Sequence, residues 1–133
     1  MKKIILILFA SAFLSSCLND DEPKFQLEYL PIDEAITPQS FEMGIVDTIK
    51  LKYTLPNSCY FFNDLHYEYQ DTIRVVAIIG AKQLDVNCAE VITQKEFKFT
   101  VMPNQTEDYV FKFYKGRDSN NESIFDEVVI PVN

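Results

Sequence analysis

The sequence predicts an all-β protein: a single antiparallel, seven-stranded β-sandwich that follows an N-terminal signal peptide. Over short segments apolar residues alternate with polar ones, which is the period of a half-buried strand and not of a helix. Proline and asparagine clusters separate these segments at intervals of roughly 8 to 15 residues, as turns do. The chain has 133 residues, 14% of them aromatic. This is enough for one packed core and too little for two domains.

The strand pattern is clearest over residues 49–55, where isoleucine, leucine and tyrosine alternate with lysine and threonine. The other predicted strands are residues 25–29, 65–69, 73–79, 97–101, 109–113 and 128–132. Residues 73–79 are apolar almost throughout, which is typical of a central strand covered on both faces. Pro31 and Pro38 interrupt the chain after the first strand, so the sequence predicts an irregular crossing there.

Around Tyr109 the chain resembles the immunoglobulin-like fold. The stretch Thr106-Glu107-Asp108-Tyr109-Val110-Phe111 is similar to the entry into the sixth strand of such domains, where a tyrosine turns the corner. Phe111 stands where those domains often carry a core cysteine, so the resemblance covers the architecture and this one corner. It implies an immunoglobulin-like sandwich. A small up-and-down barrel is the alternative.

Residues 1–16 have the pattern of a secretory signal peptide. Lys2 and Lys3 precede a short apolar run that ends at Ser15, well short of the roughly 20 residues of a membrane-spanning helix. The ending Leu14-Ser15-Ser16-Cys17 resembles the lipobox of bacterial lipoproteins. That resemblance implies that Cys17 becomes the first mature residue and carries the membrane-binding lipid. An ordinary signal peptide with a chance cysteine is the alternative.

Residues 17–23 read as an acidic tether that joins the lipidated cysteine to a β-sandwich domain of residues 24–133. Asp20-Asp21-Glu22 resembles the surface-export signal of Bacteroidota lipoproteins, which implies an outer-membrane protein displayed on the cell surface. A periplasmic orientation with a merely solvated tether is the alternative. Polar, charged segments of this kind stay extended. Two acyl chains hold a protein firmly at a membrane, whereas one binds only marginally.

The charge of the chain argues against nucleic acid as a partner. The formal net charge is −8, and it becomes more negative when Lys2 and Lys3 leave with the signal peptide. Proteins that bind nucleic acid neutralise phosphates with lysine and arginine, which are scarce here. The sequence therefore predicts the lipid as the membrane contact and no nucleic-acid partner. The oligomeric state stays open.

Cys59 and Cys88 are the two cysteines left once Cys17 carries lipid. A pair of cysteines in an exported protein tends to form a disulfide, because the compartment is oxidising. The predicted strand order places both residues in connections at the same end of the sandwich. A bridge would close a loop of about 30 residues, which the chain-entropy treatment values at roughly 3.5–4 kcal/mol. Two free buried thiols are the alternative.

Three further features are candidate sites. Tyr60-Phe61-Phe62 follows Cys59 in a predicted loop, and at least one of three consecutive rings should be exposed and free to contact a sugar or a protein. Packing beneath the disulfide is the alternative. Asp47-Thr48-Ile49 and Asp71-Thr72-Ile73 resemble the Bacteroidota O-glycosylation signal, which implies Thr48 and Thr72 as acceptors.

No residue pattern indicates a catalytic, metal or cofactor site. His66, the only histidine, should share a strand face with Glu68, and such a pair is more typical of a solvated contact than of acid–base catalysis. Together with Cys59 and Cys88 it falls short of the four ligands of a zinc site. Residues 118–122 place oxygen atoms at alternate positions but lack the glycine of a calcium loop, which favours a polar hairpin connection.

Taken together, the anchor and the sandwich pattern resemble the small β-sandwich lipoproteins of Bacteroidota, many of which have no assigned activity. The resemblance implies a non-enzymatic, lipid-anchored outer-membrane accessory or binding module. Its ligand would be a glycan or a protein. A structural envelope lipoprotein without a small ligand is the alternative.

Overall fold

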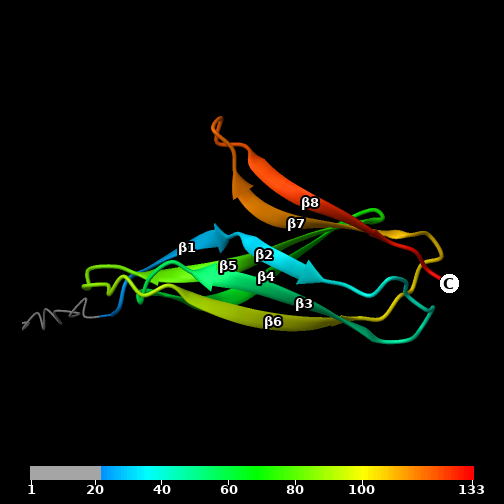
Figure 1. Cartoon of the computed structure of the whole chain (residues 1–133), viewed down its shortest axis with the longest axis horizontal. Helices are drawn as coiled ribbons and strands as arrows, with labels where there is room; N and C mark the ends of the chain where they lie inside the picture. The colour runs from blue at the N-terminus through cyan, green and yellow to red at the C-terminus, as the bar shows by residue number, and fades with distance from the viewer. Residues whose placement is uncertain (1–21) are drawn as a thin grey trace, which may run out of the picture.

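The computed structural model describes residues 22–133, so the predicted signal peptide, Cys17 and most of the tether lie outside the described residues. Within this part the chain is all-β (Figure 1). Its strands are β1 Phe25–Leu30, β2 Ile32–Ile36, β3 Asp47–Leu55, β4 Tyr60–Gln70, β5 Ile73–Gln83, β6 Thr93–Val101, β7 Tyr109–Arg117 and β8 Ser123–Ile130. Among residues 22–133 there is no helix that could cross a membrane.

The strands form two separate sheets in a sandwich-like arrangement (Figure 1). The small sheet has the order β2-β3-β6, with antiparallel neighbours. β5 is the centre of the large, five-stranded sheet. β4 pairs along one edge of β5, whereas the other edge is shared: β1 pairs with residues 78–83 and β7 with residues 73–76. β8 lies beyond β7.

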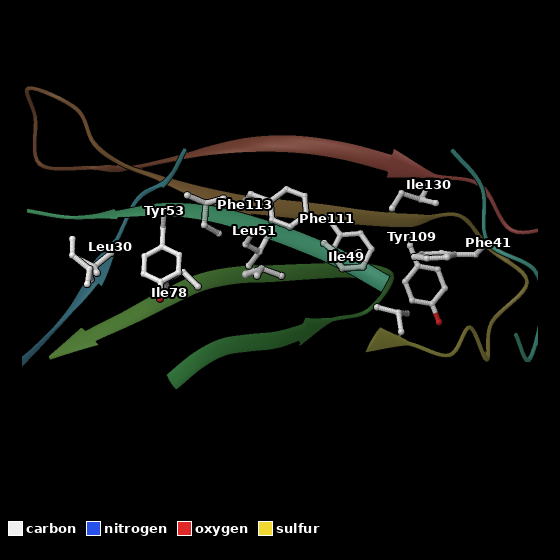
Figure 2. Packing of buried hydrophobic residues seen from close by; sticks show 14 residues of the cluster. Leu30, Phe41, Ile49, Leu51, Tyr53, Ile78, Tyr109, Phe111, Phe113 and Ile130 are labelled. Carbon is white, nitrogen blue, oxygen red and sulfur yellow. The ribbon is translucent and has the colours of Figure 1, made fainter. Parts of the chain in front are cut away.

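The core lies between the sheets and consists of the apolar residues that strand alternation turns inward (Figure 2). β3 contributes Ile49 and Leu51, and the large sheet contributes Ile78, Phe111 and Phe113, all of them buried. The rings of Phe111 and Phe113 stack with their centroids 5.6 Å apart. Burying a side chain of this size stabilises the fold by roughly 1.5–3 kcal/mol, so this layer holds the sheets together.

The strand count and the pairing differ from the predicted seven antiparallel strands. The additional strand is β2, which occupies part of the segment predicted as an irregular crossing. Pro31 lies between β1 and β2, so it interrupts the chain only where it passes from one sheet to the other. β5 and β7 pair in parallel, because β6 crosses to the small sheet between them. The alternation of apolar and polar residues predicts neither the additional strand nor the parallel pairing.

The strand order differs from that of the immunoglobulin-like fold. At the start of β7, the hydroxyl of Tyr109 accepts a hydrogen bond from the backbone N–H of Asn104 at 3.2 Å. In constant-type immunoglobulin domains the fourth strand joins the sheet of the first, second and fifth. Here the fourth predicted strand, β5, lies between β4 and β7, in a different sheet from the second and fifth predicted strands, β3 and β6. The fold is therefore sandwich-like, with its own strand order.

Candidate functional site

The predicted disulfide between Cys59 and Cys88 is present, with the two Cα atoms 5.4 Å apart. It joins the β3–β4 connection to the β5–β6 connection, which lie at the same end of the molecule as predicted. β1 begins at this end too, since the backbone N–H of Leu84 donates to the carbonyl of Lys24 at 2.8 Å. The tether precedes Lys24 in the sequence. The disulfide therefore lies at the end where a lipid anchor on Cys17 would join the domain.

Tyr60, Phe61 and Phe62 do not form the predicted loop, because β4 already begins at Tyr60. Alternation along β4 sends the three rings to two different faces. Phe62 turns inward and stacks on Phe97 with the ring centroids 4.7 Å apart. Phe61 turns outward, is 41% exposed and contacts Phe25 edge-on at 5.3 Å. The prediction of at least one exposed ring is confirmed, and the loop interpretation is wrong.

The outer face of the large sheet, on the side away from the core, is rich in apolar side chains. The register places Phe61 and Leu27 beside Ala81, and Tyr29 beside Ile79, on this face. Its exposed apolar residues are Phe25, Leu27, Tyr29, Phe61, Phe125 and Val129. An antiparallel sheet with one solvated face normally presents polar residues there. A contiguous apolar patch on such a face marks an interaction site.

A groove divides this face because β1 and β7 diverge along the shared edge of β5. β7 pairs with β5 only as far as Phe113, and then a bulge between Tyr114 and Gly116 bends it away. Gly116 has φ 113°, a conformation that other residues rarely adopt. The β7–β8 hairpin therefore rises away from β1 (Figure 1). Two adjoining hollows of about 640 and 290 Å³ share Tyr29 and Tyr114 as lining residues.

Aromatic rings follow one another across this groove from β4 to β8. Tyr29 lies 5.2 Å from the ring of His66 and 5.7 Å from that of Tyr114, measured between centroids. Tyr114 lies 6.0 Å from Phe125. Small aliphatic side chains of β5 form the floor of the two hollows, namely Val75, Ala77 and Ile79. We call this site, lined by Tyr29, His66, Tyr114 and Phe125, the aromatic groove.

Polar groups line one side of the aromatic groove. The Nδ1 atom of His66 lies 3.3 Å from the hydroxyl of Tyr29, and its Nε2 atom lies 3.3 Å from a carboxylate oxygen of Glu68. Gln70 donates to the other oxygen of Glu68 at 3.0 Å. This hydrogen bond, and to a smaller extent His66, lowers the pKa of Glu68. Lys112 and Ser123 complete the polar lining. The predicted His66–Glu68 pair thus exists and orients groups at a groove.

The other sequence candidates lie elsewhere. Thr48 is exposed at the start of β3, and Thr72 is half-buried in the β4–β5 turn; their glycosylation stays a prediction. One carboxylate oxygen of Asp118 accepts hydrogen bonds from the backbone N–H groups of Asn120 and Glu122, which explains the polar hairpin connection without an ion. Within residues 22–133, no three histidine, cysteine or acidic side chains gather as a metal site would require.

The aromatic groove is not apparent from the sequence, although its parts are. The alternation of Phe25, Leu27 and Tyr29 predicts β1 but does not tell which side of the sheet these residues face. The signal that could have found the groove is the β5 sequence, which is apolar at consecutive positions and so predicts cover on both faces. The cover on the outer face comes from the side chains of the groove itself.

Comparison with known proteins supplies no relative: no protein-family model matches the chain, and no curated protein or solved structure is significantly similar to it.

Proposed function

We propose that this chain is a lipid-anchored outer-membrane binding module, displayed on the cell surface and non-enzymatic, whose aromatic groove binds a glycan. The observation that carries the proposal is the row of aromatic rings across the outer face of the large sheet, with hydrogen-bonding groups along one side. The C–H faces of a pyranose ring pack on aromatic rings, and its hydroxyls need donors and acceptors at the rim. The groove offers both.

The polar groups favour a glycan over a protein partner. His66, Glu68 and Gln70 form a fixed chain of hydrogen bonds. Planar groups held in this way can donate to and accept from neighbouring hydroxyls of one sugar. A protein interface more often centres on a fully apolar core with charged residues excluded. Here Glu68 and Lys112 stand within the groove.

The proposed anchor rests on Leu14-Ser15-Ser16-Cys17, and the proposed surface display rests on Asp20-Asp21-Glu22. Cys17→Ala should abolish labelling by a fatty-acid probe, and unchanged labelling would refute lipidation. Replacing Asp20, Asp21 and Glu22 together by alanine should reduce cleavage of the protein by protease added to whole cells. Equal cleavage of both proteins would leave the acids as a plain tether.

Glycan binding in the groove is tested by titrating the purified mature protein with soluble polysaccharides while amide chemical shifts are measured. We expect shifts at Tyr29, His66 and Tyr114, and binding weakened at least about tenfold by Tyr29→Ala, since exposed aromatic anchors carry much of such binding energy. Ile92→Ala is the control, because Ile92 is an exposed apolar residue outside the groove. Shifts unaffected by Tyr29→Ala would refute the proposal. A lack of any polysaccharide binding would favour the structural envelope role.

A further inference from the structure

Arg74 is the only buried charged side chain among residues 22–133, with 4% of its surface exposed. It lies on the inner side of β5, at the end of the molecule opposite the disulfide. Its Nη1 atom donates to the backbone carbonyls of Asp71 and Ile73, and its Nη2 atom donates to the side-chain oxygen of Gln105 at 3.0 Å. All three acceptors are uncharged.

The guanidinium of Arg74 has no counter-ion in the described chain. No ion pair within 4 Å involves it, although acidic residues outnumber basic ones in the protein. The rings of Tyr69 and Tyr109 face it at 4.3 and 5.1 Å, which offsets part of the cost of burying the charge. Leaving a buried charge without an opposite charge is otherwise strongly unfavourable.

Arg74 also has an N–H group without an acceptor in the described chain. A guanidinium carries five N–H donors, and three are engaged here. The Nε atom is fully buried and has no hydrogen-bond partner, the one such side-chain atom in residues 22–133. Buried polar groups are almost always paired, so an unpaired donor needs an explanation. A missing acceptor is the simplest one.

A cleft of about 310 Å³ adjoins Arg74. It opens between the free edges of β4 and β6, which belong to different sheets and do not pair. Tyr67 and Tyr69 line it from β4, and Thr100 lines it from β6. Burial raises the pKa of Tyr67 to about 12, whereas nearby Arg74 acts in the opposite direction. The Tyr67 hydroxyl therefore stays protonated and able to donate at neutral pH.

We propose that this cleft binds the carboxylate of a small organic acid, with Arg74 and Tyr67 as donors. An arginine fork matches a carboxylate better than it matches a spherical anion, because both are planar. The aromatic and aliphatic walls suit the carbon skeleton of the acid, and the volume limits it to about the size of one sugar acid. The site is separate from the aromatic groove and does not depend on the proposed function.

Titration of the mature protein with D-glucuronate tests the proposal, with D-glucose as the uncharged control and sodium chloride at matched ionic strength. We expect amide shifts confined to residues 65–74 and 99–109, and a melting temperature raised by about 2–5 °C at saturation. Glucose and chloride should produce neither effect. Equal effects of chloride, or glucuronate shifts centred on the aromatic groove, would overturn the proposal.

Two variants make the assignment to Arg74 specific. Arg74→Lys keeps the charge but loses the fork, and it should weaken glucuronate binding at least about tenfold. Tyr67→Phe removes one hydroxyl, so it preserves the packing and remains decisive if Arg74→Lys fails to fold; it should weaken binding about three- to tenfold. Ile92→Ala, at an exposed residue that lines neither site, should leave glucuronate binding unchanged. Wild-type affinity in Tyr67→Phe would overturn the site.

Discussion

The outer faces of the two sheets are opposite in character. On the small sheet, β3 and β6 present lysine, glutamate and threonine to solvent, and Glu96 pairs with Lys50 at 3.5 Å and with Lys98 at 3.7 Å. On the large sheet the corresponding face presents Phe25, Tyr29 and other apolar side chains around a groove. Both sheets bury their inner faces in the same core.

This difference between the two outer faces is the basis for placing the proposed binding site on the large sheet. A solvated sheet face that carries charges needs no explanation, because alternation of apolar and polar residues is what an antiparallel sheet requires. Exposed aromatic residues reduce solubility and give the fold little stability, so a group of them on one face marks a candidate contact surface. In the proposed function, the outer face of the large sheet binds the glycan and the small sheet supports it.

The largest expected effect comes from the disulfide, since it joins two of the connections that lead from one sheet to the other. Cys88→Ser should lower the free energy of unfolding by roughly 3.5–4 kcal/mol in the chain-entropy treatment. For a domain of this size that corresponds to a melting temperature lower by about 10–15 °C in calorimetry. Mass spectrometry of non-reduced peptides should also join Cys59 to Cys88 in the wild type.

Reducing agent provides the control for this prediction. Reducing agent should destabilise the wild type by about as much as Cys88→Ser does, and it should leave the stability of the variant unchanged. A variant as stable as the wild type would show that packing between the sheets alone holds them together.

Gly80 should give the next largest effect, because the side chain of Leu30 from β1 packs directly over it. A Cβ atom at this position would lie 2.6 Å from the Cδ1 atom of Leu30, which is itself buried. Overpacking of this kind costs roughly 1–3 kcal/mol, so Gly80→Ala should lower the melting temperature by several degrees. Since β1 carries Tyr29, the same variant should weaken glycan binding in the groove.

A double variant tests whether contact with Leu30 causes the loss of stability in Gly80→Ala. Leu30→Ala removes the atoms that the new methyl group would meet, so Gly80→Ala should cost little further stability when added to it. If the two effects simply add, the close approach of Leu30 is not the reason for the glycine.

The sequence predicts the small sheet better than the large one. Residues 49–55 and 97–101 alternate cleanly, and both strands turn the predicted side inward. The disulfide was also predictable, because strand direction places the two connections together whichever sheet each strand joins. In the large sheet, alternation identifies β1 but cannot tell a core face from an exposed aromatic face. The sequence pattern alone therefore predicts a loop at Tyr60-Phe61-Phe62, where the structure has the start of a strand.

What the sequence does not predict depends on contacts between distant residues. The groove exists because β1 and β7 share one edge of β5, a pairing between segments about 50 and 35 residues away along the chain. The isolation of Arg74 is likewise a tertiary property. The residue interrupts an apolar run in the sequence, which marks it as unusual, but only the fold shows that no carboxylate of residues 22–133 forms an ion pair with it.

The smallest expected effect concerns the charged face of the small sheet. Glu96→Ala removes both ion pairs and leaves Lys50 and Lys98, which are cross-strand neighbours, without the acid between them. Exposed pairs contribute little, so the melting temperature should fall by less than about 3 °C at low salt. At 1 M salt, where the Debye length is about 3 Å, the difference from the wild type should shrink further.

Tyr29→Ala is the counterpart of this variant on the large sheet and completes the comparison. Both changes remove one exposed side chain from an outer face, so both should leave the fold nearly as stable as the wild type. Only Tyr29→Ala should alter glycan binding, since Glu96 lies on the outer face of the small sheet and does not line the aromatic groove. A loss of binding in Glu96→Ala, or a salt-independent loss of stability, would contradict the division of the molecule into a supporting and a binding sheet.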